Sequence, residues 1–165
     1  MGIARFVPWL ALLAACSTAR VGPASTQYSE AALDARMPDG RRHASLMALA
    51  EDFEVPPGEN IVVRELGRDS HVSHHMVAVR DREAPHRHDH SAMTVVVLKG
   101  RGRMMIEGEE RPIGAGSIIY VPPATVHAYI NAKGGALAIA YVMFSPPLRA
   151  GDRAPPTAPL PSAAV

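Results

Sequence analysis

The sequence has a single cysteine, no excess of charge of either sign, and no long apolar run beyond its first residues. One cysteine excludes an intrachain disulfide, so a hydrophobic core alone must hold the fold. The chain has 17 lysines and arginines against 16 aspartates and glutamates, and the basic residues are scattered, so nothing indicates a nucleic-acid partner. A length of 165 residues suits one domain with tails.

Histidines are the most informative residues that the sequence does contain. His86 and His88 are two apart, and His127 follows almost forty residues later. On a strand, residues i and i+2 project from the same face about 6.5–7 Å apart, so two imidazoles and a third from a neighbouring strand can meet at one ion. Three neutral imidazoles suit a divalent transition metal and leave coordination positions open, as catalytic metals require. A histidine-rich surface loop is the alternative, which the ordered strand pattern around His127 disfavours.

These segments resemble the two conserved motifs of the cupin family. The resemblance covers about residues 59 to 145, and its spacing is more specific than its individual residues. In the first motif, Met93 stands where the family usually has glutamate, and Arg80 where it has the leading glycine. In the second motif, Ala124 replaces a glycine. The positions that match the family's spacing are His86, His88 and Gly100 in the first motif and Gly116, Pro122, His127 and Asn131 in the second.

The resemblance implies an all-β fold, a small antiparallel jelly-roll barrel with a metal in its mouth. Because Met93 replaces the usual glutamate, a three-histidine site like that of thiol dioxygenase-like cupins is the closer analogue. His90 extends the histidine run and is a candidate fourth ligand, or else a residue of the rim. Iron is the metal we expect first, with nickel, manganese, zinc or copper as alternatives. A thioether disfavours magnesium and calcium and is compatible with copper.

Turn signals and apolar alternation predict the barrel strands. A short helix is expected within residues 43–54, before Pro56-Pro57, and a Pro- and Ala-rich disordered tail over residues 146–165. The expected strands are Asn60–Leu66, Val72–Arg80, Met93–Leu98, Arg103–Glu107, Ser117–Val121, Val126–Ile130 and Ala136–Phe144.

The same alternation assigns side chains to the barrel interior. We expect Met93, Val95 and Val97 to line the pocket. Tyr129 lies two residues beyond the third histidine and faces the same way, either as a hydrogen-bond donor near the ion or as a barrel-filling aromatic. His75 shares an apolar face of its strand and is either a second catalytic group that moves protons or a satisfied core histidine.

The N-terminal residues have the pattern of an export signal. Arg5 precedes an apolar stretch that ends at Leu13-Ala14-Ala15-Cys16, which resembles the lipobox of bacterial lipoproteins. By that resemblance residues 1–15 are a signal peptide, Cys16 carries a lipid, and residues 16–42 are a flexible tether to a barrel over residues 43–145. Ser17 in place of aspartate implies the periplasmic face of the outer membrane. The alternative is an ordinary signal peptide that leaves Cys16 free.

Two functions fit this pattern. The first is a metalloenzyme, dioxygenase-like, that acts on a small molecule through an ion held by the three histidines. The second is a barrel that binds or senses a metal or small ligand without turnover, copper handling included. A barrel whose histidines bind metal only adventitiously is a third interpretation. The sequence does not separate the first two, and it leaves open whether two copies form a homodimer.

Overall fold

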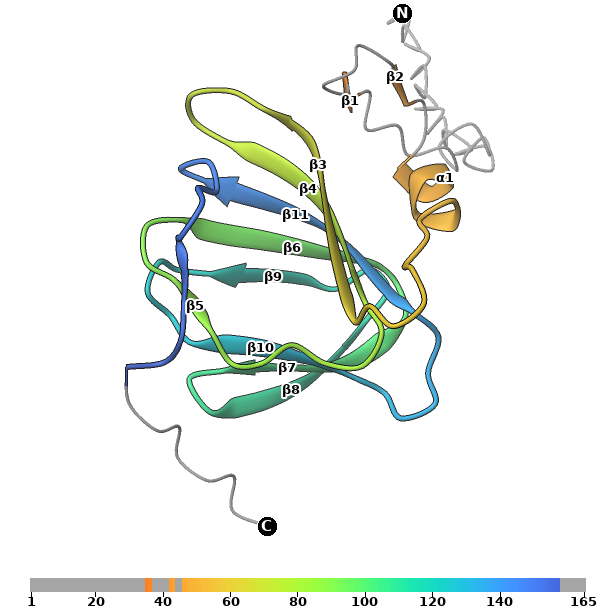
Figure 1. Cartoon of the computed structure of the whole chain (residues 1–165). Coiled ribbons are helices and arrows are strands. Elements are labelled where there is room, and N and C mark those ends of the chain that lie inside the picture. Colours follow the sequence, from red (N-terminus) through yellow and green to blue (C-terminus); the bar gives the residue numbers. More distant parts are fainter. Residues whose placement is uncertain (1–34, 37–41, 44–45, 158–165) are drawn as a thin grey trace, which may run out of the picture.

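The computed structural model describes residues 35–36, 42–43 and 46–157, and it has the expected all-β architecture (Figure 1). Two antiparallel sheets face each other and enclose the interior. The larger sheet has five strands and the smaller has three. In spatial order, the larger contains β3 (Ile61–Arg68), β4 (Ser73–Val79), β11 (Ala138–Ser145), β6 (Ala92–Lys99) and β9 (Ile118–Val121), and the smaller contains β10 (His127–Asn131), β7 (Arg101–Ile106) and β8 (Glu109–Gly114).

Strand alternation divides the larger sheet into two apolar faces. On β4, Val77 and Val79 pack into the space between the sheets, whereas Met76 and Ala78 face outward. The outward face is covered by α1 (Leu46–Glu51), which lies within the expected helical segment and buries Leu49. The interior face is thus left free to form a pocket.

Strand β8 was not expected from the sequence. It carries Glu109, Glu110 and Arg111, and its first four residues are exposed, so it has no apolar alternation to detect. A tight turn at Glu107 and Gly108, both with positive φ, folds it back on β7. A turn with two successive positive φ values matches the twist of a hairpin, and the β7 ladder then specifies the strand.

The C-terminal segment differs from the expected disordered tail over residues 146–157. We call these residues the C-terminal strap. Within it, β12 (Arg153–Ala154) pairs antiparallel with β5 (Arg87–His88), and Asp152 is 3% exposed. The guanidinium of Arg87 also donates a hydrogen bond to the Pro155 carbonyl. The strap packs on the barrel despite its proline-rich composition, because its strand β12 pairs with β5. Residues 158–165 lie outside the described residues.

The N-terminal expectations fall mostly outside the described part of the chain. The proposed signal peptide and Cys16 are not described. Within the expected tether, β1 (Ala35–Arg36) pairs with β2 (Arg42–His43). Among the described residues, no helix combines the length and the hydropathy needed to cross a membrane.

Candidate metal centre

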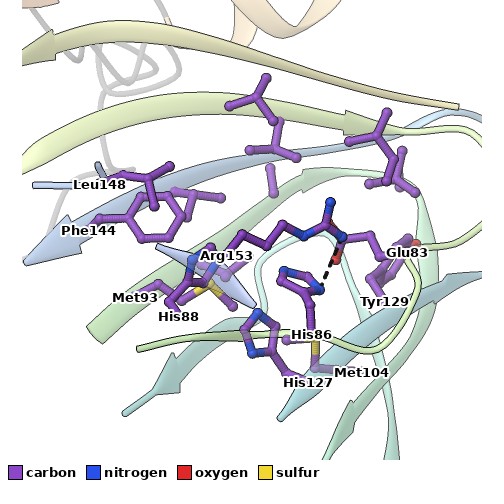
Figure 2. Close-up of a pocket in the computed structure, with 18 of the residues that line it drawn as sticks. Glu83, His86, His88, Met93, Met104, His127, Tyr129, Phe144, Leu148 and Arg153 are labelled. Atoms are coloured by element: carbon purple, nitrogen blue, oxygen red, sulfur yellow. Dashed lines mark hydrogen bonds between the residues drawn. The ribbon is translucent and has the colours of Figure 1, made fainter. Parts of the chain in front are cut away.

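A cavity of about 210 Å³ lies between the two sheets and holds the functional side chains at one end (Figure 2). Most of its wall is apolar and comes from β3, β4, β6 and β11. All four residues expected in the wall or beside the ion line it, namely Met93, Val95, Val97 and Tyr129. Its polar members are His86, His88 and His127 together with Glu83, Arg149 and Arg153.

The three histidines expected to hold a metal converge in this cavity. One nitrogen of each ring lies within 4.8 Å of one nitrogen of both others, and all three residues are buried. Ring centroids are 4.4 Å apart for His86 and His127, 5.2 Å for His86 and His88, and 5.5 Å for His88 and His127. In the described part of the chain, this trio is the one cluster of histidine, cysteine or acidic residues with metal-binding geometry.

Backbone pairing explains why residues so far apart in sequence meet here. His86 and His127 form an antiparallel bridge, with the His86 amide donating to the His127 carbonyl at 3.0 Å and the reverse bond at 2.8 Å. Directly opposed residues of an antiparallel pair project from the same face. His88, two residues further along, projects from that face as well.

Hydrogen bonds orient two of the rings in the same way. The Nδ1–H group of His86 donates to the Ala84 carbonyl at 3.0 Å, and that of His127 donates to the Thr125 carbonyl at 2.9 Å. A neutral imidazole that donates from Nδ1 carries its lone pair on Nε2. The Nε2 atom of His127 is buried and has no hydrogen-bond partner among the described residues. A buried acceptor of this kind needs a partner, and a bound cation would supply one.

A carboxylate from the C-terminal strap lies beside the third ring. Asp152 Oδ2 lies 3.6 Å from His88 Nδ1, and both atoms are buried without another partner among the described residues. The other oxygen, Oδ1, accepts the His90 amide at 2.8 Å, which fixes the carboxylate in place. A carboxylate beside the non-ligating nitrogen is the arrangement that orients metal-bound histidines in many proteins.

Burial keeps the three rings neutral, the form that binds a metal. Burial, reinforced by the neighbouring His127, lowers the pKa of His86 from 6.5 to about 3. The same two causes lower the pKa of His88 to about 4, although Asp152 opposes the shift. Burial also lowers the pKa of His127. Near neutral pH no proton competes for the ligand nitrogens.

Arg153 and Glu83 add charge at the edge of the cluster. Nη2 of Arg153 lies 3.2 Å from Nδ1 of His86, and a dashed line marks this contact in Figure 2. Burial raises the pKa of the Glu83 carboxyl, and the charge of Arg153 opposes that shift. Met93, which stands at the family's usual glutamate position, is 7% exposed and presents a thioether to the cavity in place of a carboxylate.

The structure does not bring His90 to the cluster. His90 is exposed, and its amide is bound by Asp152. The chain leaves the inner face directly after His88 because β5 has only two residues. A role for His90 at the rim fits this position, and a role as fourth ligand does not.

His75 is buried but does not line the cavity. Its ring meets Phe144 edge-on at 5.2 Å, and Phe144 in turn meets His88 at 5.0 Å, so an apolar ring separates the two imidazoles. Nε2 of His75 bonds Ser73 Oγ at 2.9 Å. This position is that of a core histidine that supports the site from behind.

Tyr129 lines the cavity, and its hydroxyl donates to Asn131 Oδ1 at 3.1 Å. The ring can lie there because Gly102 faces it, where a Cβ atom would come within 2.5 Å of the hydroxyl oxygen. The side-chain amide of Asn131 in turn donates to the carbonyls of Arg80 and Ala136. The Tyr129 hydroxyl is therefore held at the strand end by a structural asparagine.

Sequence reasoning missed Asp152, Arg153 and Glu83. Asp152 and Arg153 are the charged pair in the middle of a proline- and alanine-rich stretch, and that contrast was the available signal. Glu83 precedes the His86 motif by three residues, in a segment with no strand periodicity. None of these three positions follows from the spacing of the histidines.

The fold and the site together define a small β-barrel with a three-histidine, metal-binding type of centre. A model described as "Cupin domain" matches residues 69–144. An uncharacterized protein of Aquifex aeolicus (strain VF5) is 33% identical over 88 residues, which are 53% of this chain and 71% of that protein. The chain therefore contains a single cupin domain.

Solved structures agree with this fold at low sequence identity. TT1209 from Thermus thermophilus is 18% identical, with a TM-score of 0.54 over 61% of this chain and 95% of that one. KdgF from Halomonas sp. is 23% identical, with a TM-score of 0.51 over 59% and 86%. A Streptomyces PAC13 variant with uridine is 23% identical, with a TM-score of 0.52 over 62% and 83%.

Proposed function

We propose that this protein is a metal-dependent enzyme that acts on a small organic molecule, with dioxygenase-like chemistry at iron. The observation that carries the proposal is the buried Nε2 of His127, which has no hydrogen-bond partner in the described part of the chain. It lies with the other two imidazoles at the end of an apolar cavity. A barrel that only carried a metal would not need an enclosed, substrate-sized space beside the ion, whereas an enzyme acting on a small molecule would.

Each residue of the site has a role in this proposal. His86, His88 and His127 would hold the ion through Nε2, leaving open positions for small molecules. A bound divalent iron would supply Lewis acidity and access to dioxygen. Apolar walls would exclude water and strengthen electrostatic contacts within the site. Glu83, whose pKa is raised by burial, and Tyr129 are the candidates to hold or move a proton beside the substrate.

Small-molecule binding is supported by one structural neighbour of the same fold. The PAC13 variant named above was solved with uridine. Its identity to this chain is low, so the likeness supports a barrel that admits a small ligand and not a particular substrate.

A copper-binding barrel without turnover is the second candidate. Met93 and Met104 line the same cavity as the three histidines, and Figure 2 shows both thioethers beside the imidazole cluster. Thioether sulfur favours copper over hard metals. Methionine also fills irregular core space in many proteins, so this observation is weaker than the one above.

Metal analysis followed by an oxygen assay separates the two candidates. The purified full chain should hold one equivalent of iron per protein when it is reconstituted without oxygen. Oxygen consumption that depends on an added small molecule and stops in His127→Ala would support the enzyme. Stoichiometric copper, retained without oxygen uptake across a panel of small acids and alcohols, would support the carrier and contradict the enzyme.

We also propose that Cys16 anchors the barrel to the cell envelope by a lipid, on the periplasmic side of the outer membrane. The support is the sequence Leu13-Ala14-Ala15-Cys16 after an apolar stretch. Cys16→Ser should move the protein from the membrane fraction to the soluble periplasmic fraction. Continued membrane fractionation of this variant would contradict the anchor.

A further inference from the structure

The C-terminal strap places Arg153 against the metal-binding end of the cavity. In the β12–β5 ladder, Arg153 lies directly opposite His88, so the two side chains project to the same side of the pair. The guanidinium reaches diagonally to His86, where Nη2 lies 3.2 Å from Nδ1. A second backbone contact, Asp89 N–H to Asp152 O at 3.1 Å, holds this part of the strap in register.

The contact between Arg153 and His86 does not give the guanidinium an acceptor. Nδ1 of His86 carries the hydrogen that bonds the Ala84 carbonyl at 3.0 Å. A guanidinium has only donors, and an Nδ1 atom that already donates cannot accept from it. Within the described residues, the Arg153 side chain has no other hydrogen-bond or ion-pair partner, although its charge acts on the Glu83 carboxyl. Arg153 therefore presents donors at the cavity mouth that a bound molecule can satisfy.

The charges of the site also require an anion. A divalent ion on three neutral imidazoles, next to a guanidinium, outweighs the single buried carboxylate of Asp152. Even with Glu83 ionised, the ion and Arg153 would carry three positive charges against the two negative charges of Asp152 and Glu83. Walls of valine, isoleucine and phenylalanine keep the dielectric low and leave that charge poorly solvated. An anionic group on the bound molecule is the complementary partner.

The cavity limits what that molecule is. Its volume is about 210 Å³. An engineered apolar protein cavity of about 150 Å³ binds benzene, so this cavity has room for a molecule somewhat larger than benzene. Arg153 offers one planar fork of donors, which matches the two oxygens of a carboxylate. Met93, Phe144 and Leu148 surround the remaining space with apolar atoms.

We propose that the substrate of this site is a small monocarboxylic acid with an apolar body, and that Arg153 is the residue that binds its carboxylate. This inference rests on the proposed metal-dependent function, because the bound ion would supply most of the positive charge that the carboxylate balances. Arg153 then determines which molecules the site accepts, and the apolar wall determines their size.

The test uses the full chain loaded with Co²⁺, whose visible absorption reports changes at the ion, and two probes of equal size, benzoate and benzamide. Calorimetry should show that wild-type protein binds benzoate at least about tenfold more tightly than benzamide, since only benzoate accepts charge-assisted bonds. Arg153→Gln should weaken benzoate binding about ten- to a hundredfold and leave benzamide binding and the ligand-free cobalt spectrum unchanged. Arg153→Lys should restore part of the benzoate affinity as a point charge.

Arg111→Gln is the matched control, because it removes the same charge from an exposed position on β8. Equal benzoate affinity in wild type and Arg153→Gln, equal loss in Arg111→Gln, or no preference for benzoate in the wild type would overturn the inference. Tighter Arg153-dependent binding of phenyl phosphate than of benzoate would also overturn the carboxylate assignment. The wild-type comparison of the two probes decides the question even if both Arg153 variants fold poorly.

Failure of the metal proposal would be visible separately. Absence of stoichiometric Co²⁺ in the wild-type protein would contradict the metal centre itself. The same titrations on metal-free protein would then test Arg153 alone, since Arg153 lines the cavity. A preference for benzoate that Arg153→Gln abolishes would support the carboxylate site, and no preference would overturn it.

Discussion

The two sides of the histidine cluster are held in different ways. His127 begins β10, whose five residues pair with β7 in an unbroken ladder inside the barrel. His86 and His88 lie on a segment whose strand, β5, has two residues and pairs with the C-terminal strap. The position of His127 is therefore set by the barrel strands. The positions of His86 and His88 depend on the C-terminal strap, which lies more than sixty residues away in sequence. Such a site can be weakened from outside the barrel without unfolding it.

The largest effect is expected from the barrel side. His127→Ala removes the ligand whose Nε2 is otherwise unpartnered among the described residues, so metal affinity should fall by more than the roughly 10–100-fold that outer-sphere changes cost. The barrel should stay folded, because a catalytic type of site is rarely the main source of stability. Metal titration and thermal unfolding measure the two quantities.

His90→Ala is the matched control for that variant, since His90 is exposed and outside the cluster. It should bind metal like the wild type. Loss of metal in His90→Ala would restore the fourth-ligand hypothesis, and an unfolded His127→Ala protein would point to a structural metal.

The strap side should respond to Asp152. Asp152→Ala removes the carboxylate beside His88 Nδ1 and should lower metal affinity about 10–100-fold. Asp152→Asn keeps an acceptor for the His90 amide but loses the negative charge, so it should retain more stability while still binding metal weakly. Isothermal titration of both variants checks this. Affinities equal to the wild type would mean that the strap does not position His88.

Acid should lower the free energy of unfolding of the metal-free protein, because the histidines on both sides of the cluster have lowered pKa values. The pKa of His88 is about 4 in the folded state and about 6.5 when unfolded, so the unfolded chain binds more protons between these values. Stability is fully present above pH 6.5 and falls as pH drops toward 4, by about 2 kcal/mol at pH 5 for His88 alone.

Urea unfolding at pH 7 and pH 5 measures this loss. His88→Gln should reduce the dependence on pH, whereas His71→Gln, at an exposed position, should leave it unchanged. A wild-type protein that is equally stable at both pH values would show that the imidazoles are not held neutral by burial.

The smallest effect is expected at the turn that joins the two sides. Ala124 has a φ of 60°, and its amide donates to the His88 carbonyl at 2.6 Å. A left-handed conformation costs a non-glycine residue about 1–2 kcal/mol, which glycine avoids. Ala124→Gly should therefore raise the free energy of unfolding by about 1 kcal/mol, measurable by urea denaturation. A destabilised variant would indicate that the Ala124 methyl group makes a contact worth more than the strain.

This contrast between the two sides also explains how far the sequence could be interpreted. Strand alternation predicted the strands and the wall residue Val95, because alternation depends on neighbours a few residues apart. The resemblance to the two cupin motifs is what joined His127 to His86 and His88, which lie about forty residues earlier. Asp152 could not be found in this way, since its partner His88 lies 64 residues earlier and no periodicity links them. The inward orientation of His75 was predicted correctly, but Phe144 was not expected to separate it from the cavity.

Anomalous diffraction from crystals of the metal-loaded protein tests the central claim most directly. The account predicts one strong peak per chain, about 2.0–2.1 Å from Nε2 of each of His86, His88 and His127. A peak elsewhere, or none at this cluster under saturating metal, would contradict it.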